Sequence, residues 1–375
     1  MEKSIKTIVI SAINFNTAGP FAIFEECLCY LSQNLSNKYN IIALVHDRKQ
    51  INFKNIHCIE FKDSKRSWLK RIYYEYFYFR KLSISLNPYL WFSFHDITPN
   101  VKSEIRAVYC MNPSPFYKLS LRDIINDKGF TLFVIFYKYL YRINIKKNDF
   151  VIVHHDWMRN KFKQLFHINR VIVAPVEIVK VKEIKSENKR ETAEKVYRFI
   201  YPAFPRVFKN FEIICEAAKI LAGKGKYNFE IYLTIDGTEN RYASFIYTHY
   251  KNIKQIKFIG FQPREKIYEY YDKVDCLLFP SKLETYGMPI SEFKLFKKPI
   301  FLADLEYAYE TIGDYNQVKF FNPNNHLQLA DLMSKLMEDR VELEIIRKKI
   351  IGPPFASTWK ELFDILLSQK DQNYA

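Results

Sequence analysis

Residues 274–292 read VDCLLFPSKLETYGMPISE, and the fold of the second half of the chain can be worked out from this stretch. The apolar run at 274–278 predicts a buried strand, because the strands of a parallel sheet are covered on both faces. A loop with one glycine follows, and a proline stands where the next helix begins. Glu284 lies in this loop and Glu292 in the first turn of the expected helix. Open α/β sheets bind ligands outside the carboxyl ends of their strands, so the loop predicts a binding site.

The same alternation of strands and helices continues along the whole chain. Short apolar runs predict strands at 6–12, 40–46, 89–95, 106–111, 150–154, 171–174, 197–203, 229–235, 256–259, 275–279, 299–302 and 318–320. Helical patterns lie between them, such as 211–221, where apolar residues recur on one face with a period of 3.6. This alternation predicts an α/β fold with two doubly wound parallel sheets.

The length of 375 residues suits two domains of about 180 residues each. The charged stretch 176–191 offers little to bury and predicts a hinge loop or an exposed hairpin. Gly-Pro-Pro at 352–354 breaks the chain before a last helix, predicted at 355–367. We therefore expect an N-terminal Rossmann-like domain over 1–176, a C-terminal one over 177–354 and a final helical segment over 355–375.

Residues 280–292 resemble the signature of a known enzyme family. They match every position of the pattern P-S-x-x-E-x-(aromatic)-G-(Leu/Met)-P-x-x-E, which is typical of the family-four retaining glycosyltransferases (glycosyl transferases group 1). The resemblance is most specific over 197–300 and extends loosely over nearly the whole chain. It implies the GT-B fold, in which two Rossmann-like domains face each other across a cleft. It also implies that the second domain binds the donor, that the first binds the acceptor, and that the last helix crosses back to the first domain.

The resemblance assigns roles to the two glutamates and to the loop between them. Glu284 is implied to hydrogen-bond hydroxyls of the donor sugar, and Glu292 to hold the ribose of the nucleotide. The loop backbone implied to face the sugar and diphosphate is that of Tyr286, Gly287, Met288 and Pro289. Free amides at a helix start do attract anions. The residues alone leave another interpretation open, in which Glu292 caps its own helix and Glu284 is a solvated loop residue.

A basic segment follows the first strand of the second domain, at Arg206 and Lys209. The resemblance implies that both contact the donor's diphosphate, one as a planar fork and the other as a point charge. The other interpretation, an exposed basic helix start, conflicts with the preference of helix N-termini for anions. The family usually has glycine where this chain has Lys297, and a lysine can adopt the left-handed conformation of a helix end only at some cost, which weakens the expected loop geometry slightly.

Further loops are implied to border the nucleotide. Gly237 and the pair Gly260–Phe261 follow predicted strands, and Phe261 is expected to frame the base. Gly19 follows the first strand, where the family often has paired glycines close to the diphosphate and acceptor. Single glycines after strands are also common turn residues.

The first domain offers two positions near the expected site. Relatives tend to have histidine where this chain has Met111, so a histidine-assisted step there is not expected. His95 ends the preceding strand and is a candidate catalytic residue. A strand-end histidine bonded to backbone is the other interpretation.

Lysine and arginine outnumber the acids 57 to 41, for a net charge of +16, and 17% of the residues are aromatic. Such a charge balance indicates that the partner is nucleic acid or an anionic membrane surface. The other explanation is drift in the composition of the gene, with no binding partner implied. Residues 64–82 and 130–147 combine aromatic and basic side chains, which is typical of helices at a membrane interface and also of core helices with a solvated face. No helix-turn-helix, RNA-recognition or zinc pattern occurs, so we expect no nucleic-acid partner; steeply salt-dependent binding to random DNA would revive that possibility.

The start of the chain predicts no signal peptide, and no apolar run approaches the roughly 20 residues of a transmembrane helix. The six cysteines have no metal-binding spacing and indicate a reduced, cytoplasmic protein. No Asp-x-Asp follows a strand, so we expect no metal and no other cofactor, with the cations at 206 and 209 neutralising the diphosphate.

Taken with these features, the resemblance implies a retaining glycosyltransferase that moves a sugar from a UDP- or GDP-sugar to a hydroxyl of a lipid-linked glycan acceptor. The family's commonest setting implies synthesis of a bacterial surface polysaccharide, such as O-antigen or capsule, in the cytoplasm or on the inner face of the cytoplasmic membrane. A nucleotide-sugar epimerase or hydrolase of the same fold is the alternative enzyme class, and a basic nucleic-acid-binding protein the alternative outside catalysis.

Overall fold

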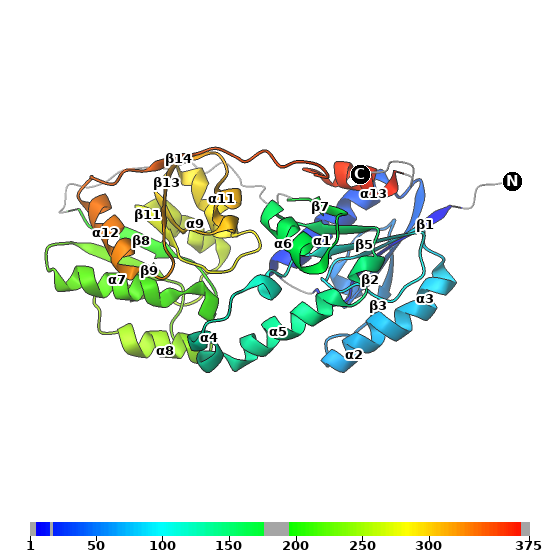
Figure 1. The fold of residues 1–375 in the computed structure, drawn as a ribbon, viewed down its shortest axis with the longest axis horizontal. Helices are drawn as coiled ribbons and strands as arrows, with labels where there is room; N and C mark the ends of the chain where they lie inside the picture. The colour runs from blue at the N-terminus through cyan, green and yellow to red at the C-terminus, as the bar shows by residue number, and fades with distance from the viewer. Residues whose placement is uncertain (1–4, 16–17, 176–194, 369–375) are drawn as a thin grey trace. The chain divides into compact units, whose positions relative to one another are not determined.

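The computed structural model describes residues 5–15, 18–175 and 195–368. By its internal contacts the chain divides into two compact units, each built on a seven-stranded sheet (Figure 1). Unit 1 comprises Met1–Phe116, Val134–Ile178 and Ile351–Ala375, and unit 2 comprises Tyr117–Phe133 and Val179–Ile350. The hinge or hairpin predicted at 176–191 lies outside the described residues.

The seven strands of unit 1 all run parallel, in the order β3-β2-β1-β4-β5-β6-β7. They are β1 (Lys6–Ala12), β2 (Tyr39–Val45), β3 (His57–Glu60), β4 (Leu90–Ser93), β5 (Ile105–Cys110), β6 (Phe150–Val153) and β7 (Val171–Val173). The order reverses between β1 and β4, which is the place where open α/β sheets bind ligands.

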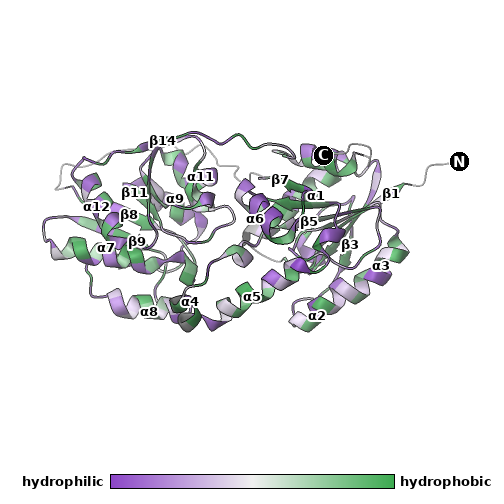
Figure 2. Cartoon of the chain, viewed as in Figure 1, coloured by the Kyte–Doolittle hydropathy of each residue, from purple (hydrophilic) through white to green (hydrophobic). Residues whose placement is uncertain are grey.

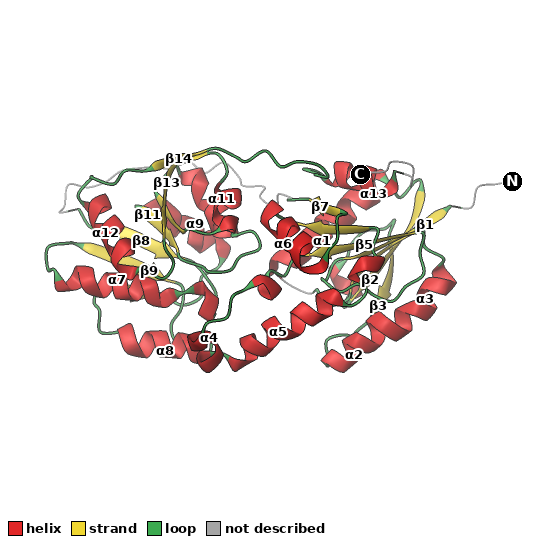
Figure 3. Ribbon diagram, in the orientation of Figure 1, coloured by secondary structure: helices red, strands yellow, loops and turns green. Residues whose placement is uncertain are grey.

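Helices cover both faces of this sheet (Figure 3). Those of unit 1 are α1 (Ala18–Asn34), α2 (Trp68–Tyr73), a π-helix (Tyr74–Tyr78), α3 (Phe79–Leu86), most of α5 (Lys128–Arg142), α6 (Asp156–Phe166) and α13 (Trp359–Leu367). Successive residues of β1 face opposite sides, since the side chains of a strand alternate. Ile8 and Ile10 join the core that contains α1 and α13, whereas Val9 joins a second core that contains Phe79 of α3.

Unit 2 repeats this architecture with one antiparallel edge strand. Its strands are β8 (Tyr197–Tyr201), β9 (Phe229–Leu233), β10 (Ile256–Phe258), β11 (Cys276–Phe279), β12 (Ile300–Ala303), β13 (Tyr315–Phe321) and β14 (Glu344–Ile346). They are ordered β10-β9-β8-β11-β12-β13-β14, and β14 runs antiparallel to β13. The helices are α4 (Leu121–Asn126), α7 (Phe211–Gly223), α8 (Arg241–Tyr250), α9 (Arg264–Lys273), α10 (Met288–Phe293), α11 (Glu306–Ile312) and α12 (His326–Met337). The switch in strand order falls between β8 and β11.

The predicted fold class is confirmed, and every predicted strand is present to within two or three residues. Two edge strands, β3 and β14, were missed because they are short and half-exposed, with charged residues among the apolar ones. The start of the last helix was predicted wrongly. It begins at Trp359 with Thr358 as its N-cap, and Phe355 instead bridges to Val173 at the edge of the unit 1 sheet.

The predicted first domain, 1–176, includes Tyr117–Phe133, whereas the structure groups this segment with unit 2. The rings of Tyr117 and Phe130 pack on Phe208, with centroids 6.4 and 5.0 Å apart. The helix α5 therefore begins in unit 2 and continues into unit 1. The final segment belongs to unit 1, where α13 packs in the same core as α1.

His154, directly after β6, is buried without a charge. Burial, with a smaller contribution from neighbouring His155, lowers the pKa of His154 to about 3. The Tyr109 hydroxyl donates to the carbonyl oxygen of Ala174 at 2.5 Å, so it accepts a hydrogen bond from His154 Nδ1 at 3.1 Å. The neutral ring with its proton on Nδ1 fits this arrangement.

We expect unit 1 to lose stability as the pH falls from about 6.5 toward 3. An unfolded histidine takes up a proton near pH 6.5 and native His154 does not, so acid favours the unfolded chain across that range. All four tryptophans (68, 91, 157 and 359) lie in unit 1, so tryptophan fluorescence during urea unfolding reports on this unit. His154→Asn keeps a hydrogen-bond donor for Tyr109 and should make the free energy of unfolding less dependent on pH. His57→Asn, at an exposed position, should leave that dependence unchanged. The same slope in wild type and His154→Asn would contradict this assignment.

Candidate active site

The candidate site in unit 2 is formed where two central strands end. β8 and β11 are parallel neighbours, with Phe199 opposite Cys276 and Ile200 opposite Leu277. Their carboxyl ends therefore lie at one edge of the sheet, and the loops that follow are tied together. Lys282 N donates to the carbonyl oxygen of Phe208 at 2.7 Å.

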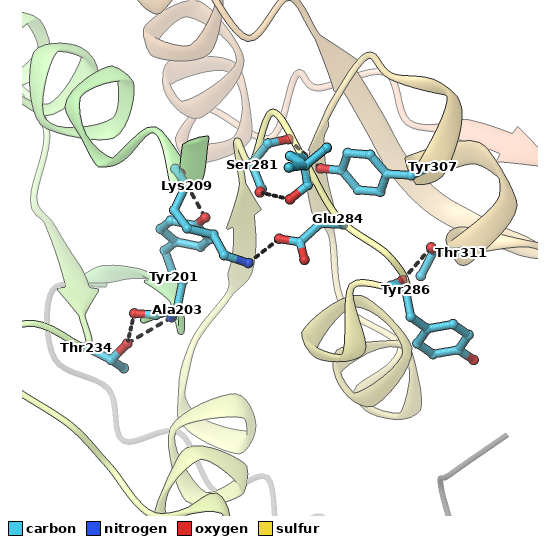
Figure 4. Close-up of polar contacts among 10 residues, drawn as sticks. Tyr201, Ala203, Lys209, Thr234, Ser281, Glu284, Tyr286, Tyr307 and Thr311 are labelled. Atoms are coloured by element: carbon cyan, nitrogen blue, oxygen red, sulfur yellow. Dashed lines mark hydrogen bonds and ion pairs between the residues drawn. The ribbon is translucent and has the colours of Figure 1, made fainter. Parts of the chain in front are cut away.

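A lysine and a glutamate from these two loops form an ion pair. Lys209 Nζ bonds directly to Glu284 Oε1, although the residues are 75 apart in sequence (Figure 4). Only 18% and 12% of their side chains are exposed, so the pair is shielded from most of the solvent. The backbone of Lys209 is also fixed, since its carbonyl accepts a 2.8 Å hydrogen bond from the hydroxyl of buried Tyr201. The pair thus places one cation and one hydrogen-bond acceptor at the edge where ligands bind.

The loop around Glu284 is held by side chains that the sequence did not indicate. Tyr307 donates to the carbonyl oxygen of Ser281 at 2.6 Å, and Thr311 to that of Tyr286 at 2.6 Å (Figure 4). The Ser281 hydroxyl donates to the carbonyl oxygen of Leu283 at 3.0 Å. Loops positioned in this way hold functional groups rigidly. Nothing in the sequence near Tyr307 or Thr311, both in α11, marks them as partners of this loop.

Gly287 directs the chain from the loop into α10. It has φ +72° and is the N-cap of the helix, with Met288 and Pro289 at the first positions. A Cβ at Gly287 would lie 3.0 Å from Ile290 Cδ1, and other residues are strained at this φ. The glycine is therefore required by the backbone. The Tyr286 ring is half-buried next to it.

Glu292 lies at the fifth residue of α10 rather than in its first turn. Its Oε1 lies 2.9 Å from an Nη of Arg264, the first residue of α9, and its side chain is 8% exposed. Burial raises the pKa of Glu292, and the adjacent guanidinium opposes that rise. The carboxylate thus pairs with a neighbouring helix, in contrast to the self-capping interpretation.

Arg206 is exposed and lies at the N-cap of the short 3₁₀-helix 207–209. Its guanidinium lies over the ring of Phe204, 5.5 Å from the ring centroid. Arg206 and Lys209 therefore belong to one turn, with the arginine toward solvent and the lysine toward Glu284.

The loops at Gly237 and Gly260 both use the glycine amide in a hydrogen bond within the protein. Gly237 (φ +95°) donates its amide to Glu239 Oε2 at 3.0 Å, and a Cβ there would lie 2.8 Å from Tyr247 Cβ. Gly260 (φ +66°) donates to the carbonyl oxygen of Ile235 at 3.3 Å. Both amides are thus occupied, and these glycines serve close backbone packing. Phe261 is 81% exposed and available to a planar group.

In unit 1, His95 is only 2% exposed and both ring nitrogens have partners. Nδ1 donates to the carbonyl oxygen of Ser11 at 3.1 Å, and Nε2 bonds to Glu75, a buried residue of the π-helix. Arg71 donates to the carbonyl oxygen of His95 at 2.8 Å. These contacts favour the structural interpretation of His95.

The neighbouring strand end at Met111 is fixed by the carboxyl group of Asp96. Asp96 Oδ1 accepts hydrogen bonds from the amides of Met111 and Asn112 at 2.6 and 3.0 Å, and burial raises the pKa of Asp96. Met111 is itself buried. Gly19 lies in the first turn of α1, the helix that follows β1 in the chain. Among the described residues, no group of three or more His, Cys, Asp or Glu side chains is placed to hold a metal ion.

The comparisons with known proteins point to one fold. Residues 181–351 match the family model described as Glycosyl transferases group 1. No curated protein sequence matches the chain. Among solved structures, WaaG, a glycosyltransferase involved in lipopolysaccharide biosynthesis, has a TM-score of 0.62 at 12% identity, covering 88% of this chain and 90% of that one.

Two further structures give the same picture. A glycosyltransferase from Rickettsia africae has a TM-score of 0.61 at 14% identity, with 90% of this chain and 89% of that one covered. HepE from Anabaena, in complex with UDP-glucose, has a TM-score of 0.53 at 13% identity, with coverages of 89% and 90%. At these identities the likeness shows the fold alone, and it supports the predicted GT-B fold with two Rossmann-like domains.

Proposed function

We propose that the protein is a retaining glycosyltransferase, which moves a sugar from a UDP- or GDP-sugar to a hydroxyl of a lipid-linked oligosaccharide in bacterial surface polysaccharide synthesis. The observation that carries this proposal is the contact between Lys209 and Glu284 at the adjoining ends of β8 and β11. Both residues lie within 181–351, the part of the chain that matches the glycosyl transferases group 1 model.

In the proposed reaction, the acceptor oxygen attacks the anomeric carbon from the face that the diphosphate leaves. The bond from this carbon to the diphosphate oxygen breaks, and its electron pair stays with the diphosphate. The acceptor's hydroxyl proton passes to a phosphate oxygen, and the new bond keeps the anomeric configuration. Lys209 and Arg206 stabilise the charge that develops on the diphosphate, and Glu284 orients the sugar through its hydroxyls. Two cations in one turn supply this charge, so we propose that the reaction needs no metal.

The nucleotide is proposed to bind along the carboxyl edge of the unit 2 sheet. The Glu292 carboxylate accepts hydrogen bonds from the ribose, and Phe261 packs on the base. The likeness to a structure that contains UDP-glucose supports a UDP-sugar donor, and a GDP-sugar remains the second candidate. The acceptor is assigned to unit 1.

The proposal is tested by acceptor dependence and stereochemistry. Purified protein is incubated with UDP- and GDP-sugars, with and without glycolipid extracts, and nucleotide release and the product's anomeric signal in NMR are followed. We expect release only with acceptor, and a product with the donor's configuration. Release without acceptor would favour the alternative of an epimerase or hydrolase of this fold, and an inverted product would contradict retention.

The described helices include none that is long and apolar enough to cross a bilayer. Exposed apolar side chains instead occur on α2, the π-helix, α3 and α5 of unit 1, together with exposed basic ones. Figure 2 shows hydrophobic and hydrophilic residues mixed along α2, α3 and α5. The rings of Trp68 and Phe136 meet at a centroid distance of 5.4 Å, which joins α2 to α5. We call this surface the aromatic-basic face; its exposed members are Trp68, Leu69, Tyr73, Phe77, Ile84, Ile135, Phe136 and Tyr139, with Lys65, Arg66, Lys70, Arg80, Lys81, Lys138 and Arg142. We propose that it places the cytoplasmic protein on the anionic inner face of the membrane.

Loss of two apolar side chains from this face should weaken vesicle binding. Leu69 and Phe77 are 78% and 64% exposed, and we expect the Leu69→Gln/Phe77→Gln variant to bind phosphatidylglycerol vesicles about tenfold more weakly. Co-sedimentation measures the change. Leu327→Gln, at a 62% exposed position of unit 2, is the matched control. Equal binding by both variants, or equal binding to neutral phosphatidylcholine, would contradict the membrane assignment.

A further inference from the structure

Arg264 lies at a position where a positively charged side chain is electrostatically unfavourable. It is the first residue of α9, and the positive end of a helix dipole disfavours a guanidinium in the first turn. An Nη of Arg264 lies 2.9 Å from Oε1 of Glu292 in α10, which compensates for this cost. The pair is asymmetric, since the side chain of Glu292 is 8% exposed and that of Arg264 is 49% exposed.

The guanidinium is held in place from a second side. It lies over the ring of Tyr268, one turn further along α9, at 5.7 Å from the centroid, and an Nη is 3.4 Å from the Tyr268 hydroxyl oxygen. Arg264 is therefore clamped between Tyr268 and Glu292. α9 also begins directly after the loop that contains Gly260 and Phe261, so the ion pair joins this loop to α10.

The state of the Glu292 carboxyl group decides what it can bind. An ionised carboxylate accepts hydrogen bonds on both oxygens, whereas a protonated one becomes a donor at one of them. Burial raises the pKa of Glu292 and favours the protonated form; Arg264, and to a smaller extent Tyr268, oppose this. Arg264 and Tyr268, both on α9, act on the pKa of Glu292. Burial, and after it the charge of Glu292, raise the pKa of Tyr271 on the same helix.

We propose that Arg264 is the positioning residue of the ribose subsite: it fixes the Glu292 carboxylate, charged and oriented, so that this group selects nucleotides with both ribose hydroxyls. Arg264 acts through Glu292. The inference rests on the proposed function, since it requires a nucleoside diphosphate at this edge of the sheet.

The test is calorimetric titration of the full chain, without metal, using UDP, GDP and the 2′-deoxy and 3′-deoxy forms of whichever one binds. Wild type should prefer the ribonucleotide over at least one deoxy form by about tenfold or more, because a hydrogen bond to a charged group is lost. Arg264→Gln should weaken ribonucleotide binding about tenfold and abolish that preference. Arg264→Lys should restore most of both, and Lys273→Gln, at an exposed position of the same helix, should change neither.

The possible results distinguish a failure of this inference from a failure of the proposed function. If wild type binds a nucleotide and Arg264→Gln keeps both affinity and preference, the inference is overturned and the proposed function stands. If Arg264→Gln weakens all the nucleotides equally while its thermal midpoint is unchanged, Arg264 contacts another part of the ligand, and the inference is likewise overturned. If wild type binds neither UDP nor GDP, both fail.

Discussion

Lys209→Ala is expected to lower the rate of sugar transfer by about 10²–10³-fold, with a smaller effect on donor affinity. The substitution removes the cation that stabilises charge on the departing diphosphate, and the loss of one such group typically costs this much. The charge develops in the transition state, so the loss should appear mainly in kcat. Transfer is measured as acceptor-dependent release of nucleotide.

Two controls separate catalysis from folding. Lys219→Ala changes an exposed lysine of the neighbouring helix α7 and should leave the rate unchanged. Lys209→Arg keeps the charge and should retain part of the activity. A rate for Lys209→Ala within about threefold of wild type would remove Lys209 from the mechanism.

Glu284→Gln should have the second-largest effect, with transfer reduced on the order of 10²-fold. The amide has nearly the same shape as the carboxylate, but it loses the charge that pairs with Lys209 and the strong hydrogen bonds to sugar hydroxyls. Glu265→Gln, at an exposed position of unit 2, is the matched control.

The double variant Lys209→Ala/Glu284→Gln tests whether the two side chains act together. Since the two side chains are in direct contact, we expect the double variant to be little slower than Lys209→Ala alone. Multiplication of the two single losses would mean that the residues act independently, which would contradict a shared site.

The fold could be predicted from the sequence because the patterns that indicate its strands and helices are local. Buried strands such as β11 appear as apolar runs, and the motif at 280–292 contains its own turn and helix-start residues. Lys297, where the family usually has glycine, adopts the left-handed conformation in the structure, with φ +54°. The edge strands β3 and β14 were missed because partial exposure weakens the apolar pattern.

The contacts around the candidate site could not be predicted, because they join distant segments. Nothing local in the sequence of α9 indicates that Arg264 pairs with Glu292, or in that of α11 that Thr311 holds the loop at Tyr286. The same holds for Glu75, which a π-helix directs to His95. The sequence identified the candidate residues, and the structure was needed to show what each one contacts.

The most direct test of the donor site is calorimetric titration of UDP and GDP into the purified protein with EDTA present, for wild type and Glu292→Ala. We predict micromolar binding of one nucleotide to wild type and a loss of at least about tenfold in the variant, because a hydrogen bond between the ribose and a charged group disappears. No binding of either nucleotide to wild type, or equal binding by Glu292→Ala, would contradict a nucleotide-sugar site at the carboxyl edge of the unit 2 sheet.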